Sequence, residues 1–232
     1  MIKIRLAEDR GHTQLNWLDS FHTFSFGEYF DPEQMGFSHL RVINDDKIKP
    51  GMGFDMHGHR DMEIISYVIA GELAHQDSLG NGSVIRPGEI QRMSAGTGIR
   101  HSEFNPSKTE EVHLLQIWIT PNQTGLKPSY EQKLIPAGQN RWIELASPNQ
   151  QTSLITIHQD VFLYAAHLSQ SEVIGYTFKP QRCGWIQLAK GKISLNGVIL
   201  SAGDGAALID ESFIQVTCLE EAELLLFDLT CL

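Results

Sequence analysis

The run Tyr67-Val68-Ile69-Ala70-Gly71-Glu72, which leads through a Gly-rich turn to Pro87-Gly88-Glu89, decides the fold. A stretch of the same plan returns later, where Gln187-Leu188-Ala189-Lys190-Gly191-Lys192 leads through Asn196-Gly197 to Ala202-Gly203-Asp204-Gly205. Each copy consists of an apolar β-type run, a glycine turn, a second run and a tight turn. This repetition predicts two similar β-domains in one chain.

The remainder of the chain also favours short strands over helices. Helical periodicity is scarce, and apolar runs alternate with turns rich in Gly, Pro, Asn and Asp. Runs of this kind span residues 40–44, 64–69, 112–119, 154–158, 185–188 and 224–229. The sequence therefore predicts an all-β protein built from sandwiches or barrels.

The length of 232 residues allows two domains, and a chain of this size needs no disulfide or metal merely to fold. The polar, Pro-containing stretch 121–148 lacks sustained alternation, so it is the expected connector. We therefore expect an N-terminal metal-binding domain over residues 1–130, a linker over 131–148 and a C-terminal domain over 149–232.

Composition excludes several classes of protein. The 18 basic against 28 acidic residues give a net charge of −10, which argues against direct binding of nucleic acid but allows a protein partner or a small ligand. The longest apolar runs, such as 224–227, are too short to span a membrane, and residues 1–10 lack a signal-peptide core. Three cysteines, Cys183, Cys218 and Cys231, suit a reducing compartment, so we expect a cytoplasmic protein.

Histidine is unevenly distributed, because eight of the ten precede residue 114. In a strand, residues two apart point to the same face, so His57 and His59 would present two imidazoles side by side. A second pair at this spacing, His101 and Glu103, follows the Gly96-Thr97-Gly98 loop. If the two strands are neighbours, three imidazoles and one carboxylate converge, which is a metal-binding arrangement.

The other histidines and the aromatic residues of the N-terminal half indicate no specific chemistry. His-x-acid pairs also occur at His59/Asp61, His75/Asp77 and His158/Asp160, so the spacing alone does not define a site. His22 and His39 are more typical of hydrogen-bonded structural residues, and His75 and His113 have no assigned role. The N-terminal aromatic residues suit either barrel packing, which we favour, or the wall of an aromatic substrate pocket; they are Phe21, Phe24, Phe26, Tyr29, Phe30 and Phe37.

The context of the two pairs resembles the cupin superfamily. Its first motif is matched by Gly51, His57, His59 and Glu63, with Gly71 one residue later than usual, and its second by Pro87-Gly88, Gly96 and His101. More specifically, the chain is similar to the bacterial branch of the pirin family with quercetinase-type activity. This resemblance covers roughly residues 11–120 and rests on the segments 17–27, 29–32, 35–37, 41–46, 57–63 and 93–103.

The resemblance implies a bicupin, that is, two jelly-roll barrels, with one divalent metal in the N-terminal barrel. Carried over by position, the metal ligands are His57, His59, His101 and Glu103. Classical cupins take the carboxylate from the position of Glu63 instead, so Glu63 stays open as a ligand or as a residue that orients one. Between residues 185 and 228 there is no histidine, so we expect the C-terminal domain to lack a metal site.

Such a site leaves coordination positions open, as non-haem iron oxygenases require, and Fe(II) is the expected metal, with Mn, Co, Ni and Zn also compatible. The resemblance implies a quercetin 2,3-dioxygenase, which cleaves flavonols with O2 and releases carbon monoxide and a depside. Glu103 would be the catalytic proton acceptor. The alternative is a metal- or redox-dependent regulatory protein that binds a transcriptional or metabolic partner.

Overall fold

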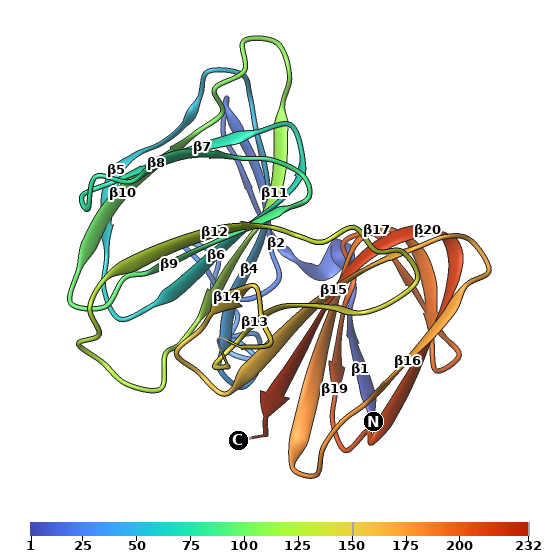
Figure 1. Ribbon diagram of the computed structural model, residues 1–232. Coiled ribbons are helices and arrows are strands. Elements are labelled where there is room, and N and C mark those ends of the chain that lie inside the picture. The colour runs from blue at the N-terminus through green and yellow to red at the C-terminus, as the bar shows by residue number, and fades with distance from the viewer. Residues whose placement is uncertain (150, 232) are drawn as a thin grey trace. The chain divides into compact units, whose positions relative to one another are not determined.

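The computed structural model describes residues 1–149 and 151–231, and strands dominate it (Figure 1). A single turn of 3-10 helix, η1 (Ala7–Asp9), is the only helix in these ranges, which confirms the all-β prediction. No helix in the described part of the chain is long and apolar enough to cross a membrane. The chain forms two compact units: the first barrel holds residues 11–135 and 157–159, and the second holds 1–10, 136–156 and the chain from 160 on.

The first barrel contains two antiparallel sheets that face each other (Figure 1). The seven-stranded sheet has the order β12 (Ser129–Leu134), β9 (Glu89–Ser94), β6 (Glu63–Ala70), β11 (Val112–Ile119), β4 (Leu40–Ile48), β3 (Leu18–His22) and β2 (Gly11–Gln14). The four-stranded sheet has the order β5 (Gly53–His59), β10 (Ile99–Phe104), β7 (Leu73–Asp77) and β8 (Gly82–Ile85).

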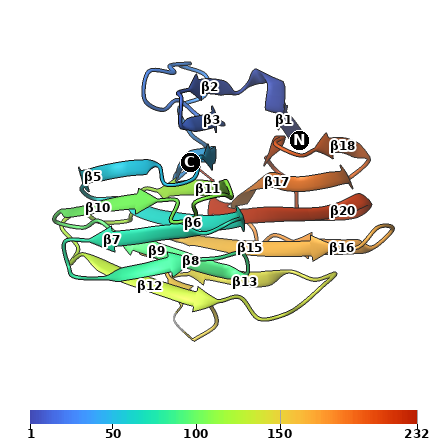
Figure 2. The same cartoon turned by 90° about the horizontal axis from the view of Figure 1, so that it is seen from above.

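The second barrel is one sheet whose long strands pass through both of its layers (Figure 2). Its order is β1 (Ile2–Arg5), β19 (Gly205–Leu208), β17 (Arg182–Leu195), β20 (Phe213–Thr230), β15 (Val161–Leu168), β13 (Ile143–Ser147) and β14 (Ile155–Thr156). Two further strands, β16 (Val173–Thr177) and β18 (Val198–Ser201), pair with β20 and β17.

The two barrels share one strand order. Strand β17 takes the places that β6 and β7 hold in the first barrel, and β20 takes those of β10 and β11. β17 stays continuous through a bend at Gly191, where φ is +79° and an added Cβ would lie 2.0 Å from the carbonyl oxygen of Glu221. In the first barrel the corresponding chain breaks at Gly71, which separates β6 from β7.

The boundaries of the units differ from the expected division at residues 130 and 149. β1 pairs with β19 of the second barrel, in register from Ile2 opposite Leu208 to Arg5 opposite Gly205. The expected linker contains most of β12, which pairs with β9, and all of β13, which pairs with β15. Local sequence did not indicate these pairings, because β12 is a polar edge strand without alternation and β1 meets a partner far along the chain.

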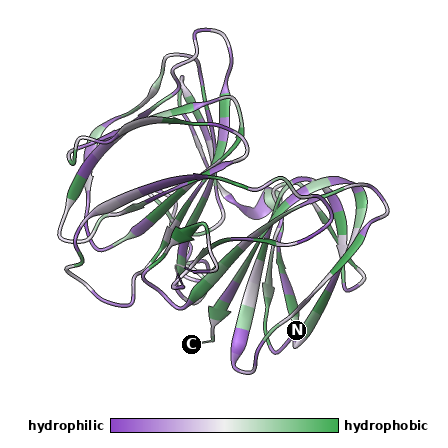
Figure 3. Ribbon diagram, viewed as in Figure 1, coloured by the Kyte–Doolittle hydropathy of each residue, from purple (hydrophilic) through white to green (hydrophobic). Residues whose placement is uncertain are grey.

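Hydrophobic and hydrophilic residues alternate along the strands (Figure 3), and many of the hydrophobic side chains are buried. In the second barrel a large cluster of buried apolar side chains includes Ile186, Leu188, Leu224 and Leu226. In the first barrel the buried apolar side chains form separate clusters, one that contains Val68 and Leu114 and another that contains Ile64 and Met93. Between these clusters β6 buries Ser66, so a polar level crosses the interior of the barrel.

Candidate metal centre

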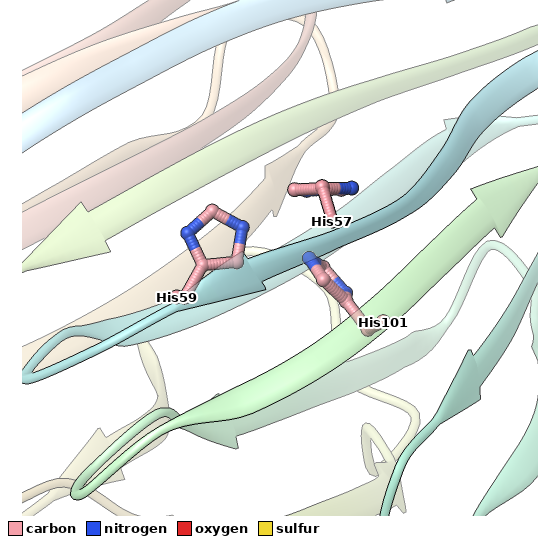
Figure 4. A group of neighbouring side chains, drawn as sticks. All are labelled: His57, His59 and His101. Atoms are coloured by element: carbon pink, nitrogen blue, oxygen red, sulfur yellow. The ribbon is translucent and has the colours of Figure 1, made fainter.

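Three histidines meet on the four-stranded sheet of the first barrel. His57 and His59 lie on one face of β5, and His101 of β10 lies directly opposite His57. Their ring centroids are 4.5–4.9 Å apart, and a nitrogen of each lies within 4.8 Å of the others (Figure 4). The structure thus brings together the three histidines that the sequence singled out.

These imidazoles offer ring nitrogens as possible metal ligands. His101 is buried, and neither of its ring nitrogens has a hydrogen-bond partner within the described residues. Burial, together with repulsion between the neighbouring imidazoles, lowers the pKa of His59 to about 4 and that of His101 to about 3. His57 Nδ1 lies 2.7 Å from the carbonyl oxygen of Asp55, which can only accept, so Nδ1 donates in this contact and Nε2 is the nitrogen available as a ligand. Such a set fits a divalent transition metal.

Glu103 lies beside this group and is held by two donors. The hydroxyl of Ser66 donates to Oε1 at 3.0 Å, and the side-chain amide of Gln116 donates to Oε2 at 2.6 Å. Trp118 Nε1 donates to the amide oxygen of Gln116 at 3.3 Å, which fixes the orientation of that amide. One oxygen of the Glu103 carboxylate and one ring nitrogen each of His101 and His75 lie within 4.8 Å of one another. His101 therefore belongs both to this group and to the group of three histidines.

Glu63, the other candidate carboxylate, lies in a different cluster. It accepts a hydrogen bond from Ser94 Oγ at 2.9 Å and lies 3.9 Å from Arg92 and 3.3 Å from His158 Nδ1. It belongs to neither group of side chains that could hold a metal ion among the described residues. Its charge is therefore matched by a buried arginine rather than directed at the three histidines.

His75 and Asp77 of β7 also lie beside the proposed metal-binding residues, and the sequence indicated no role for them. Burial would raise the pKa of Asp77, but hydrogen bonds from Asn81, His75 and Leu79 hold it below its ordinary value. An ionised Asp77 accepts from His75 Nε2 at 3.3 Å, which leaves Nδ1 buried without a partner in the described chain. The His75-x-Asp77 spacing was a weak signal, and only the register shows that His75 lies opposite Glu103.

The turn before β10 is fixed by close backbone contact. Gly96 has φ +46°, and a Cβ there would lie 2.0 Å from the carbonyl oxygen of Leu126. The amide of Thr97 donates to that same oxygen at 2.8 Å, and the amide of Asp61 donates to the carbonyl of Gly96 at 2.9 Å. Only glycine allows this approach, so Gly96 sets the position from which the strand delivers His101.

A pocket of about 840 Å³ opens beside the histidines, within the range typical of small-molecule sites. Its aromatic lining is Trp17, Phe26, Phe54, Phe104 and Trp118, and its polar lining includes Ser20, His22, Asn44, Asp46, His57, His59, Glu103 and Gln116. Of the N-terminal aromatic residues, Phe26 lines the pocket whereas Phe24 is buried. His22 is hydrogen-bonded as expected, to Asn44 and Thr13, and it also lines the pocket.

Comparisons with known proteins agree with this geometry. The family pattern described as Pirin matches residues 3–119, and that described as the quercetinase C-terminal cupin domain matches residues 144–229. The two matches confirm the predicted bicupin fold.

Several relatives match almost the full chain. The quercetin 2,3-dioxygenase of Escherichia coli (strain K12) is 50% identical over 229 residues, 99% of each chain. A pirin-like protein of Caulobacter vibrioides is 41% identical and covers 98% of this chain and 99% of its own. The crystal structure of the bacterial pirin YhhW in complex with nickel(II), from Escherichia coli, has a TM-score of 0.95 at 49% identity and covers 100% of both chains.

Proposed function

Because the chain belongs to the pirin family, we propose that it is a metal-dependent dioxygenase that cleaves flavonols such as quercetin with O2. The observation that carries this proposal is the aromatic-lined pocket that contains His57 and His59. A planar aromatic substrate could pack against its walls while its oxygen atoms reach the metal centre. The similarity to a relative named quercetin 2,3-dioxygenase supports this choice of substrate class.

We assign His57, His59, His101 and Glu103 as the ligands of one divalent metal. The three histidines offer neutral nitrogen donors, and Glu103 adds a carboxylate oxygen next to His101. Fe(II) is our choice, with Mn, Co, Ni and Zn as alternatives, because these ligand types accept all of them. The nickel complex of the related YhhW is consistent with a divalent ion. When bound, the metal supplies a Lewis acid that acidifies a flavonol hydroxyl, and open positions for O2.

Glu103 is the proposed acceptor of the proton of the flavonol 3-hydroxyl. The hydrogen bonds from Ser66 and Gln116 fix the orientation of its carboxylate. The oxygen that does not bind the metal keeps a lone pair beyond its hydrogen bond, so the side chain can still accept a proton. The apolar walls, among them Trp118 and Phe26, would hold the rings and exclude water.

The proposed reaction balances without a further reductant. Two carbon–carbon bonds of the heterocycle break, and the carbon atom between them leaves as carbon monoxide. Both atoms of O2 enter the products, and the proton taken by Glu103 returns to the depside.

The test compares Glu103→Gln with Glu63→Gln in metal-loaded protein. We expect O2 uptake, carbon monoxide release and loss of quercetin absorbance in the wild type, and a decrease of more than about 100-fold in Glu103→Gln. Glu63→Gln should keep most of the turnover per bound metal, because Glu63 lies outside the pocket. A fully metal-loaded wild type that turns over no faster than free metal would refute the proposal.

A regulatory role through a protein partner is the alternative that the family resemblance carries. The pocket favours the enzyme, because a regulatory surface does not require an aromatic-lined pocket of about 840 Å³ beside the metal centre. We also place the protein in the cytoplasm, since Cys183, Cys218 and Cys231 are all free.

A further inference from the structure

Within the same pocket, we propose that Asp46, Asn44 and His22 form a hydroxyl-binding site that selects aromatic substrates bearing hydroxyl groups beyond those bound at the metal. This inference rests on the proposed function, because it assumes that an aromatic molecule occupies the pocket. It assigns substrate selection to β3 and β4, which carry none of the proposed metal ligands.

The register of the seven-stranded sheet places a row of polar residues across its inner face. His22 lies opposite Asn44, Asn44 opposite Gln116, and Gln116 opposite Ser66. Ser66 and Gln116 donate to Glu103, so that half of the row already has a partner. The other half, Asn44 and His22, lines the pocket on the neighbouring strands.

Asp46 lies two residues after Asn44 on β4, so its side chain is on the same face of the sheet and extends this polar surface. It lies opposite Ser20, whose hydroxyl donates to it, and both residues line the pocket. Asp46 is 2% exposed, and the charged groups that act on it, Asp45 and Glu103, are also acidic. A buried carboxyl group without a cation is costly unless donors satisfy it. The phenolic hydroxyls of a substrate would supply such donors.

Asn44, held in place by His22, offers a hydrogen-bond donor beside the acceptor Asp46. His22 Nδ1 lies 2.8 Å from the amide oxygen of Asn44, and His22 Nε2 lies 2.9 Å from Thr13 Oγ1. These contacts fix the orientation of the Asn44 amide, whose NH2 group can donate to a phenolic oxygen while Asp46 accepts from a phenolic hydroxyl. Burial raises the pKa of Asp46 to about 7 although the hydrogen bond from Ser20 lowers it, so this one donor does not offset the burial of the carboxyl group.

The site predicts a preference that binding experiments can measure. Quercetin and 3-hydroxyflavone share the 3-hydroxyl and 4-keto oxygens, but 3-hydroxyflavone has no other hydroxyl. Metal-loaded wild type should bind quercetin at least about tenfold more tightly in anaerobic isothermal titration calorimetry at fixed pH. In Asp46→Ala this ratio should fall towards one, through loss of quercetin affinity while 3-hydroxyflavone affinity is retained.

Two further variants keep the test decisive. Asp46→Asn preserves the shape of the side chain and its contact with Ser20, and should also lower the ratio. Asp45→Ala is the matched control, because this neighbour on β4 pairs with His113 and does not line the pocket. An unchanged ratio in folded, metal-loaded Asp46→Asn, or equal binding of both flavonols by the wild type, would overturn the inference. Binding is read without O2, so absent turnover with the expected ratios would refute the dioxygenase proposal alone.

Discussion

The two barrels share a strand order and differ in what they bury. In the first barrel, β5 and β10 carry His57, His59 and His101 towards the interior. In the second barrel, the corresponding β16 and the first half of β20 bury apolar residues, among them Ile174 and Val216. The architecture therefore does not determine the chemistry, which depends on the residues placed at a few inward positions of equivalent strands.

The two barrels also differ in how their interiors contribute to stability. The second barrel contains a large cluster of buried apolar side chains, which stabilises it by burial. The first barrel divides its apolar residues between clusters on either side of a polar level that contains Ser66, Gln116 and Glu103. Buried polar groups contribute little net stability even when they are hydrogen-bonded, so the first barrel depends on those clusters to hold its site.

The largest effect is expected from His101→Ala, because His101 belongs to both groups of metal-capable residues in the first barrel. Metal content should fall to a small fraction of one per chain, and turnover by more than about 100-fold. Elemental analysis and O2 uptake measure these changes. His113→Ala is the control, since His113 pairs with Asp45 away from the pocket; full metal retention in His101→Ala would contradict the assignment.

Asp46→Asn should change how the stability of the first barrel depends on pH. Burial, followed by repulsion from Asp45 and Glu103, raises the pKa of Asp46 from 3.8 to about 7. Between these values the folded state holds a proton that the unfolded state has lost, so wild-type stability falls as pH rises from about 4 to about 7 and then stays level.

In metal-free protein, Asp46→Asn should therefore gain stability relative to the wild type as pH rises, by up to about 4 kcal/mol at pH 8. Urea denaturation at several pH values measures the difference, and subtracting the wild type removes the contribution of other titrating groups. A difference that is the same at pH 4 and pH 8 would be inconsistent with a raised pKa.

Leu226→Ala tests the apolar filling of the second barrel. Leu226 is fully buried in its large cluster, so truncation should lower the free energy of unfolding by about 3 kcal/mol. Metal content should be unchanged, because both metal-capable groups found among the described residues lie in the first barrel. Ile199→Ala, at a side chain that is 56% exposed, should cost less than about 0.5 kcal/mol. Loss of metal in Leu226→Ala would show that the barrels do not behave separately.

The smallest expected effect is that of His75→Gln, which removes the imidazole held between Asp77 and the ligand region. We expect metal affinity to fall about tenfold, as for other residues that orient ligands. Competition with a chelator measures the affinity, and His113→Gln serves as the control. Asp77→Asn should lower the metal affinity by a similar factor. Unchanged metal affinity in both variants would show that His75 and Asp77 only fill space beside the metal ligands.

The sequence singled out the three histidines that the structure brings together, but it did not indicate the limits of the two compact units. The spacing of His57 and His59 indicates a shared face, and the pair at His101 and Glu103 indicates a second strand. Alternation along single strands cannot show which strands pair, so the opposition of His75 and Glu103 was not predictable. Asp46 was missed for the same reason, because only the register of β3, β4 and β11 aligns it with the pocket.

The pairing of β1 with β19 has a consequence for synthesis of the protein. Ile2 leaves the ribosome about 200 residues before Leu208, its partner in the sheet. At about 5–20 residues per second, this segment waits roughly 10–40 s for the strand that it will join. The first barrel, whose residues run only from 11 to 159, can close during that interval. The second barrel completes its sheet with Ile2–Arg5, so its assembly waits until residue 208 has been synthesised.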